Sequence, residues 1–111
     1  VLQGIQLLFV PAQWPFPRQE HWRILNQARA IENQLYVACV NGCGDYGGVV
    51  SCGSSMLVDP LGQVVCQAGT EEQMVCGEAD FSQVARVRAQ IPVFQDRRPE
   101  VYRLECPSGC S

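Results

Sequence analysis

Two short apolar runs that flank a helical segment constrain the fold of this chain more than any other feature. Residues 5–10 and 35–40 are short and apolar, which is typical of strands buried on both faces of a sheet. Between them, residues 18–34 place apolar side chains three and four positions apart without Gly or Pro, which predicts a helix. The order predicts a βαβ unit, in which a crossover helix joins two parallel strands.

The middle of the chain predicts a loop followed by an antiparallel hairpin. Residues 42–53 contain five Gly, whose backbone entropy disfavours a strand or helix, so a loop is expected there. Residues 54–58 and 63–68 flank the segment Asp59-Pro60-Leu61-Gly62. Asp in the first position of a turn, Pro in the second and Gly in the fourth suit a type I turn. The two runs are therefore expected to pair.

The last third is expected to add a strand, a helix and an irregular tail. Residues 73–79 are expected to form a third strand after the hairpin of residues 54–58 and 63–68, which would make a three-stranded meander. Asp80 with Gln83 three residues later resembles a capping box, and Pro92 ends the apolar helical repeat that follows. The predicted class is therefore α/β, in the order β-α-β-β-β-β-α-tail, with a domain portion over residues 1–104 and an irregular tail over 105–111.

Composition argues against nucleic-acid and membrane partners. The 111 residues carry a formal net charge of −3, and none of them is Lys. A surface that binds nucleic acid needs a strong basic excess, so that partner is not expected. The longest apolar stretch, residues 5–12, is too short to span a bilayer, and no charged leader precedes it. We expect a soluble chain of the cytoplasm without a signal peptide.

The seven Cys are expected to be reduced thiols. An odd number argues against a closed disulfide framework. The pairs Cys39/Cys43 and Cys106/Cys110 each enclose three residues rather than the two of common zinc pairs, and the one His, His21, lies in another segment. No metal site is expected. The thiols expected to lie buried in strand-like runs are those of Cys39, Cys66 and Cys76.

Several strings, taken in order, carry a family resemblance. They are VPAQWP at residues 10–15, ARAIENQ at 28–34, SMLVDPLG at 55–62 and QIPVFQDRRPEVY at 90–102. In this order and spacing they resemble the second half of the nitrilase, or carbon–nitrogen hydrolase, superfamily, and within it the omega-amidase-like branch. The resemblance covers nearly the whole chain and implies half of a four-layer α-β-β-α sandwich.

The resemblance also implies an amidase chemistry that needs no metal or organic cofactor. In this family a Cys thiolate attacks an amide carbonyl, a Glu shuttles the proton and a Lys stabilises the oxyanion. This chain has no Lys, and no Cys precedes Cys39, so none of the three is matched. The catalytic set is expected upstream, and this chain alone is expected to be inactive. A replacement pair of Cys39 with His21 is disfavoured, because one His beside several Cys is no nucleophile signature.

Other residues are candidates for binding or for structural roles. Gln13 and Trp14 follow the first strand at its carboxyl end, where open α/β sheets bind ligands. The resemblance implies that they line the substrate pocket; the alternative is that Trp14 only packs. Arg29 and Glu32 lie one turn apart on a helix that docks on the sheet, so a partly buried, structural ion pair is expected. Asn41 ends a strand and is expected to cap the loop that follows; the alternative is that it contacts substrate.

Two functions remain open from the sequence. The first is a portion of an amidase that acts on small amides such as 2-oxoglutaramate. The second is a non-catalytic, truncated module that binds or dimerises, because a half-sandwich exposes the apolar sheet face that its other half should cover. In the family, oligomers form through helices of the kind expected at residues 18–34 and 81–91, so the resemblance implies a homo-oligomer.

Overall fold

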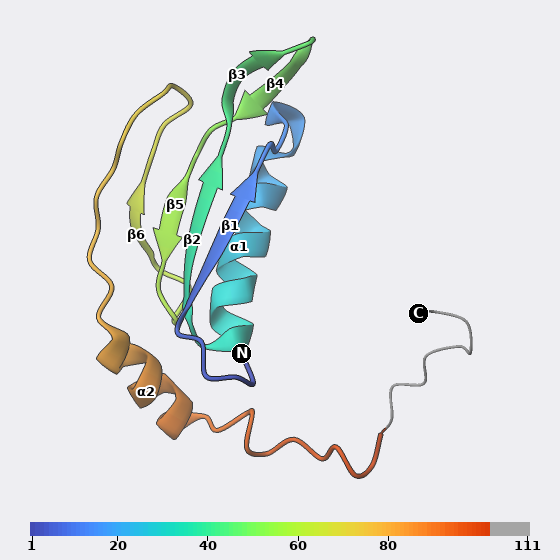
Figure 1. The fold of residues 1–111 in the computed structure, drawn as a ribbon, viewed down its shortest axis with the longest axis vertical. Helices are drawn as coiled ribbons and strands as arrows, with labels where there is room; N and C mark the ends of the chain where they lie inside the picture. The colour runs from blue at the N-terminus through green and yellow to red at the C-terminus, as the bar shows by residue number, and fades with distance from the viewer. Residues whose placement is uncertain (103–111) are drawn as a thin grey trace.

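A mixed four-stranded sheet lies at the centre of the computed structural model, which describes residues 1–102 (Figure 1). Its strand order is β1-β2-β5-β6. The strands are β1 (Leu7–Ala12), β2 (Tyr36–Asn41), β5 (Met56–Val58) and β6 (Val64–Gln67). β1 and β2 are parallel, with a short 3-10 helix η1 (Phe16–Arg18) and helix α1 (Gln19–Asn33) between them. The predicted βαβ unit is confirmed.

β5 and β6 form the antiparallel hairpin that the Asp-Pro-Leu-Gly turn predicts. The Gly62 N–H donates to the Asp59 carbonyl over 2.9 Å. The Asp59 side-chain Oδ1 accepts the N–H groups of Leu61 and Gln63, each over 2.9 Å. The carboxylate therefore holds the turn from inside, which explains why Asp59 is buried in a hairpin connection.

A second hairpin occupies residues 42–53, where a loop was expected, so that prediction is wrong. β3 (Cys43–Tyr46) and β4 (Val49–Cys52) pair in antiparallel fashion and project beyond the end of the main sheet (Figure 1). Gly47 and Gly48 have φ of 65° and 88°, the positive values that a two-residue type I′ turn requires at both central positions. The Gly residues that argued against regular structure thus make the turn.

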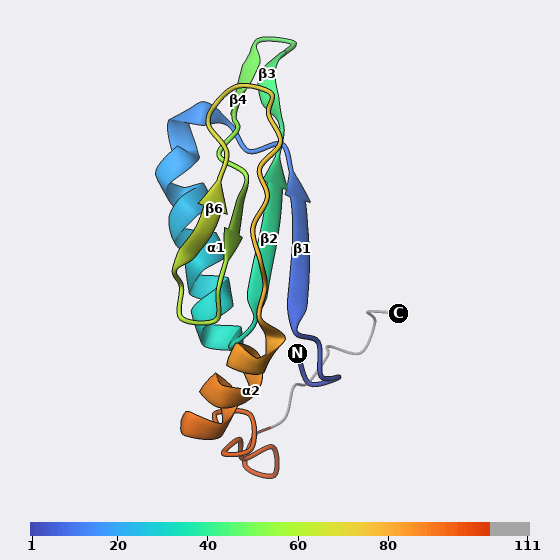
Figure 2. The same cartoon turned by 90° about the vertical axis from the view of Figure 1, so that its left-hand side faces the viewer.

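α1 covers one face of the sheet along its length (Figure 2). Its buried stripe is Trp22, Asn26 and Ala30, spaced four residues apart. Ala30 is fully buried, so the helix backbone approaches the sheet closely at that point. The sheet residues that meet this stripe are Leu8, Val10, Val37, Cys39, Met56 and Val58.

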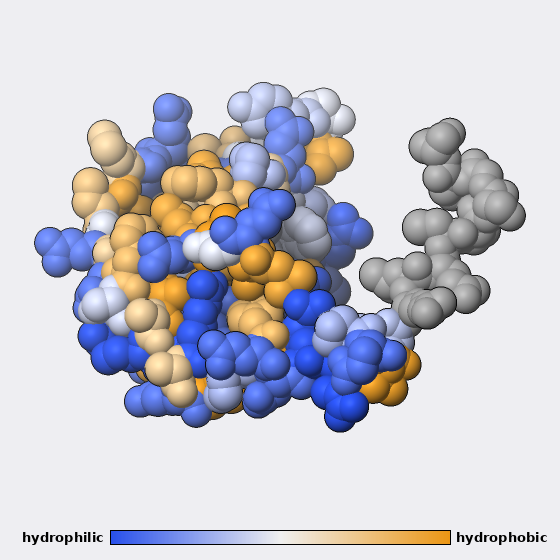
Figure 3. Space-filling view, turned by 60° about the horizontal axis from the view of Figure 1, so that its bottom comes forward, coloured by the Kyte–Doolittle hydropathy of each residue, from blue (hydrophilic) through white to orange (hydrophobic). Residues whose placement is uncertain are grey.

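Among the described residues, no helix covers the opposite face of the sheet over β1 (Figure 1). Phe9 is 69% exposed and Val40 is 59% exposed, although both are apolar strand residues. The expectation that the first strand is buried on both faces is therefore wrong. β1 also extends through Pro11, where the sequence predicted its end; β1 is an edge strand, and edge strands tolerate Pro. Figure 3 shows hydrophobic residues gathered on the surface between polar ones.

The predicted strand at residues 73–79 does not form. The segment runs past β6 without strand pairing, and a Cβ on Gly77 would lie 2.8 Å from the Cys66 sulfur. Cys66 is half-buried and Cys76 is exposed, so the prediction that both are buried is wrong, whereas Cys39 is buried. Cys106, Cys110 and the tail at 105–111 lie outside the described residues. No described helix is long and apolar enough to cross a membrane.

Helix α2 (Phe81–Gln90) docks on the end of β2 through Tyr36. The Tyr36 hydroxyl donates to Gln83 Oε1 over 2.6 Å and accepts the Asp80 N–H over 3.1 Å. Asp80 caps the helix by accepting the Ser82 N–H. The Gln83 side chain does not complete the predicted capping box, because it bonds Tyr36 and Asp59 instead.

We predict that Tyr36→Phe loosens α2 and lowers the free energy of unfolding. The change leaves the Asp80 N–H and the Gln83 amide without their partner, which costs about 1–2 kcal/mol. Urea unfolding followed by circular dichroism measures the loss. Tyr46→Phe is the matched control, since Tyr46 is 64% exposed on the hairpin. Equal stability of the two variants would contradict this role of Tyr36.

Candidate functional site

Asn41, the last residue of β2, joins three segments at the carboxyl end of the parallel strands. Its Oδ1 accepts the Trp14 N–H over 2.6 Å. Its Nδ2 donates to the carbonyl oxygens of Trp14 and Gly53, over 3.2 and 3.0 Å, and lies 3.1 Å from the Cys52 sulfur. Asn41 is 8% exposed, so these bonds are shielded from water. One amide thus fixes the loop after β1 to the segment that leads into β5.

Trp14 is held by contacts on several sides. Its indole N–H donates to the Arg18 carbonyl over 2.6 Å, and its ring centroid lies 5.9 Å from that of Trp22. The Arg18 guanidinium lies 5.7 Å from the Trp14 ring centroid, which is within cation–π range. Trp14 is therefore a packed residue that can form a wall, while its neighbour Gln13 is exposed. Their pocket role remains a prediction.

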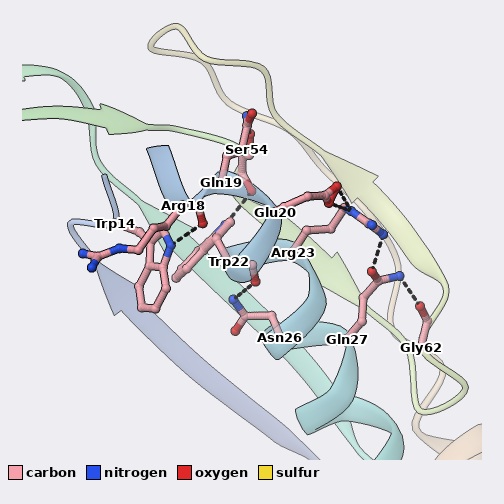
Figure 4. A network of polar contacts seen from close by, with 10 residues as sticks. All are labelled: Trp14, Arg18, Gln19, Glu20, Trp22, Arg23, Asn26, Gln27, Ser54 and Gly62. Atoms are coloured by element: carbon pink, nitrogen blue, oxygen red, sulfur yellow. Dashed lines mark hydrogen bonds and ion pairs between the residues drawn. The ribbon is translucent and has the colours of Figure 1, made fainter. Parts of the chain in front are cut away.

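A second set of polar contacts links α1 to the segment before β5 (Figure 4). The Trp22 indole N–H donates to the Ser54 carbonyl over 3.0 Å, and Gln19 Nε2 donates to Ser54 Oγ over 2.8 Å. Ser54 has a φ of 58°, an unfavourable value for a residue with a side chain. These two bonds hold Ser54 in this conformation. The start of α1 and the Asn41 network therefore both support the corner at the carboxyl ends of β1 and β2.

Two largely apolar hollows flank this corner. An open apolar hollow of about 530 Å³ lies between the Pro-rich loop and the β3–β4 hairpin. It is lined by Pro15, Phe16, Pro17, Gly48, Val49 and Val50. A narrower one of about 250 Å³ lies between β1 and α1. It is lined by Leu8, Val10, Trp14, Trp22, Leu25, Asn26 and Arg29. Neither lining includes a Cys, Asp or Glu side chain.

Arg29 and Glu32 form an ion pair on the outer surface of α1, and each side chain is 53% exposed. The expectation that Glu32 is partly buried is wrong. The buried stripe of the helix passes through Trp22, Asn26 and Ala30, which leaves Glu32 toward solvent. An exposed pair contributes little to stability, and the two residues take no part in the Asn41 corner.

Cys39 is unsuited to act as a replacement nucleophile. It is 1% exposed beneath α1, and its thiol donates to the Met56 carbonyl over 3.3 Å. Burial raises the pKa of Cys39 to about 11, which disfavours the reactive thiolate. His21 is exposed on α1, so the two residues face different surroundings. Among residues 1–102, no three His, Cys, Asp or Glu side chains gather as metal ligands.

Sequence reasoning missed the Asn41 network. It placed Asn41 at a strand end as a loop cap but did not foresee bonds to Trp14, Cys52 and Gly53. The one signal in the sequence was a polar residue that closes an otherwise apolar strand.

The arrangement described above is that of a known family. The family profile described as "Carbon-nitrogen hydrolase" matches residues 1–89, and this chain belongs to that family. A 2-oxoglutaramate amidase of Bacillus subtilis is 44% identical over 100 residues, which cover 90% of this chain and 39% of that protein. An omega-amidase of Homo sapiens is 38% identical over 105 residues, which cover 93% of this chain and 38% of that protein.

Solved structures agree with the sequence relatives. The NitFhit protein of C. elegans superposes with a TM-score of 0.85 and 39% identity, over 92% of this chain and 25% of that one. A CN-hydrolase superfamily protein of Xanthomonas campestris gives a TM-score of 0.80 and 35% identity, over 85% of this chain and 36% of that one. The chain therefore has part of a nitrilase-type fold and spans less than half the length of these relatives.

We predict that Asn41→Ala lowers the free energy of unfolding by about 2–4 kcal/mol. The change leaves buried partners of the amide, among them the Trp14 N–H and the Gly53 carbonyl, without a hydrogen bond. Urea unfolding measures the loss, and Trp fluorescence reports the freedom gained by Trp14. Asn33→Ala is the matched control, because the Asn33 amide makes only an exposed bond on α1. A loss no larger than that of the control would contradict the role assigned to Asn41.

Proposed function

We propose that this chain is the C-terminal portion of an amidase that hydrolyses the C–N bond of small omega-amides to acid and ammonia. The observation that carries the proposal is the 44% identity to a 2-oxoglutaramate amidase across 90% of the chain, together with the family profile. The corner formed by Gln13, Trp14 and Asn41 lies at the carboxyl end of parallel strands, where α/β sheets bind ligands.

The free edge of β1 supports the placement of the catalytic residues upstream. Within residues 1–102, β1 pairs with β2 alone, so its other edge has backbone groups that no described strand pairs. Beside it lies the apolar hollow between β1 and α1, which has no segment of residues 1–102 to fill it. A preceding strand added at this edge would bury the hollow and would end beside Gln13 and Trp14. The nucleophilic Cys of such a strand would then face the loop that these two residues form.

In the proposed reaction this chain binds and orients the substrate. The upstream Cys thiolate attacks the amide carbon, and the C–N bond breaks as the Glu delivers a proton to the leaving ammonia. Water then adds to the thioester carbon, and the acid leaves as the thiolate reforms. The exposed Gln13 amide can donate a hydrogen bond to a substrate oxygen, and Trp14 forms a rigid wall. The isolated chain is inactive in this proposal because it has no Lys and no nucleophile in position.

The apolar surface favours a second candidate, a binding or dimerising module. Phe9 and Val40 are exposed apolar side chains on the bare face of the sheet, and Ile24 and Ile31 of α1 are about half exposed. A chain that acts in this form would bury these surfaces against a partner or a second copy. The amidase proposal accounts for the same exposure, because the remainder of a longer protein and a second subunit would cover them.

A chimera tests the amidase proposal. Residues 1–104 replace the matching portion of the Bacillus subtilis 2-oxoglutaramate amidase, and ammonia release from 2-oxoglutaramate is measured. We predict that the chimera is active, and that the isolated 111-residue chain releases no more ammonia than its Cys-free variant. Gln13→Ala in the chimera should lower kcat/KM about tenfold, the effect of one lost hydrogen bond of about 1.4 kcal/mol. Gln63→Ala, at the β5–β6 turn, is the matched control.

Two results would count against this proposal. A folded chimera without activity would show that the chain does not supply the substrate side of an amidase, and the module would become the better candidate. Ammonia release by the isolated chain above its Cys-free variant would show that a nucleophile lies within these residues after all.

A further inference from the structure

Cys43 and Cys52 lie directly opposite each other at the base of the β3–β4 hairpin. They are paired residues in the antiparallel register of the two strands. The neighbouring pair, Gly42 and Gly53, shares a hydrogen bond from the Gly53 N–H to the Gly42 carbonyl over 3.0 Å. Because hydrogen-bonded and non-hydrogen-bonded pairs alternate along an antiparallel ladder, Cys43 and Cys52 form a non-hydrogen-bonded pair. The Cys52 N–H accordingly points away from β3 and donates to the Trp14 carbonyl over 2.9 Å.

This geometry suits a bond between the two sulfur atoms. Non-hydrogen-bonded pairs have Cα atoms about 4.5 Å apart, with both side chains on the same face. Disulfides bridge Cα separations of about 4.4–6.8 Å, so the pair lies within the range. Both thiols are free, Cys43 half-buried and Cys52 buried. A small-molecule oxidant can therefore reach Cys43, whereas Cys52 is shielded from it.

We propose that Cys43 and Cys52 are a redox modification site that closes to an intramolecular disulfide. The oxidant is a small-molecule disulfide such as glutathione disulfide. The Cys43 thiolate attacks one glutathione sulfur, the S–S bond of glutathione disulfide breaks, and one glutathione leaves. Burial raises the pKa of the Cys52 thiol, so Cys52 loses its proton only as it attacks the adjacent Cys43 sulfur of the mixed disulfide, and the second glutathione leaves. The two protons of the protein thiols end on the two glutathione molecules, so the protein is oxidised and the oxidant is reduced.

The bond would act on the corner that holds Gln13 and Trp14. The Cys52 sulfur accepts from Asn41 Nδ2, the same group that bonds the Trp14 carbonyl. Drawing the Cys52 sulfur toward Cys43 changes that contact and fixes the base of the hairpin. The hairpin also forms one wall of the apolar hollow beside the Pro-rich loop. Oxidation is thus expected to alter the contacts of Asn41 and Trp14 in the corner formed by Gln13, Trp14 and Asn41.

The other described thiols are less well placed. Cys39 lies beneath α1 and is bonded to the Met56 carbonyl. Cys66 lies opposite Leu57 in its hairpin, so its own ladder offers no Cys partner. Its nearest candidate is Cys76, beside Gly77 on the unpaired segment that runs past β6. A Cys66–Cys76 link is therefore the competing product that the experiment must separate.

Mass spectrometry of the purified 111-residue chain tests the proposal. The chain is equilibrated with reduced and oxidised glutathione, free thiols are alkylated, and a protease that cuts before Asp is added. Cuts before Asp45, Asp59 and Asp80 separate fragments 1–44, 45–58 and 59–79. A Cys43–Cys52 bond joins the first two fragments, with a mass lower than their sum by two hydrogens, whereas a Cys66–Cys76 bond stays within the third. Adding a reductant should release the joined pair.

We predict that fragments 1–44 and 45–58 are joined, that Cys43→Ser abolishes the link, and that Cys66→Ser leaves it intact. Because fragment 1–44 also contains Cys39, the Cys43→Ser result assigns the bond. The equilibrium constant for closure should be at least about tenfold larger in the folded chain than in concentrated urea, since the register raises the effective concentration of the thiols. Fragments that stay separate while other thiols oxidise, or equal closure in urea, would overturn the proposal.

Discussion

The side chains of Trp22 and Ala30 hold α1 against one face of the sheet, and the pairing of β1 with β2 and the corner at their ends both require this contact. Both are nearly inaccessible, at 2% and 0% exposure. Loss of a buried aromatic of this size costs about 3–5 kcal/mol, a large share of the stability of a domain this small. The same contact sets the crossover between β1 and β2 and so makes them parallel. Because α1 is the one helix of the described part of the chain that packs in this way, residues 1–102 leave the opposite face of the sheet bare over β1.

The corner formed by Gln13, Trp14 and Asn41 follows from the parallel pairing of β1 and β2. Parallel strands end at the same edge of a sheet, so Asn41 at the end of β2 meets the loop that leaves β1. Trp22 contributes both to the core and to the corner, because its ring packs in the core and its N–H donates to the Ser54 carbonyl. The corner is thus held by several hydrogen bonds, and its residues Gln13, Trp14 and Asn41 include no Cys, Glu or Lys. A rigid loop that lacks a nucleophile is consistent with a portion of an enzyme whose reactive residues come from elsewhere in a longer chain.

The sequence predicted the elements whose pattern is local. The apolar runs, the helical repeat and the Asp59-Pro60-Leu61-Gly62 turn each contain their own signal, and the βαβ unit and the β5–β6 hairpin form as expected. The β3–β4 hairpin does not follow from the sequence, because the backbone entropy of five Gly in residues 42–53 argues for a loop. The Asn41 network was missed because its partner Trp14 is 27 residues away. The exposure of one face of β1 could not be predicted, because an apolar run does not show whether one face or both faces of a strand are buried.

The bare sheet face around Phe9 and Val40 is expected to need cover from another surface, either the remainder of a longer protein or a second copy of the chain. Sedimentation of the purified chain over a range of concentrations checks this claim. We expect association that grows with concentration, and a shift to monomer when Phe9→Lys and Val40→Lys place charges on the bare face. A chain that remains monomeric at every concentration and binds no hydrophobic dye would contradict the claim, because its sheet would then need no further cover.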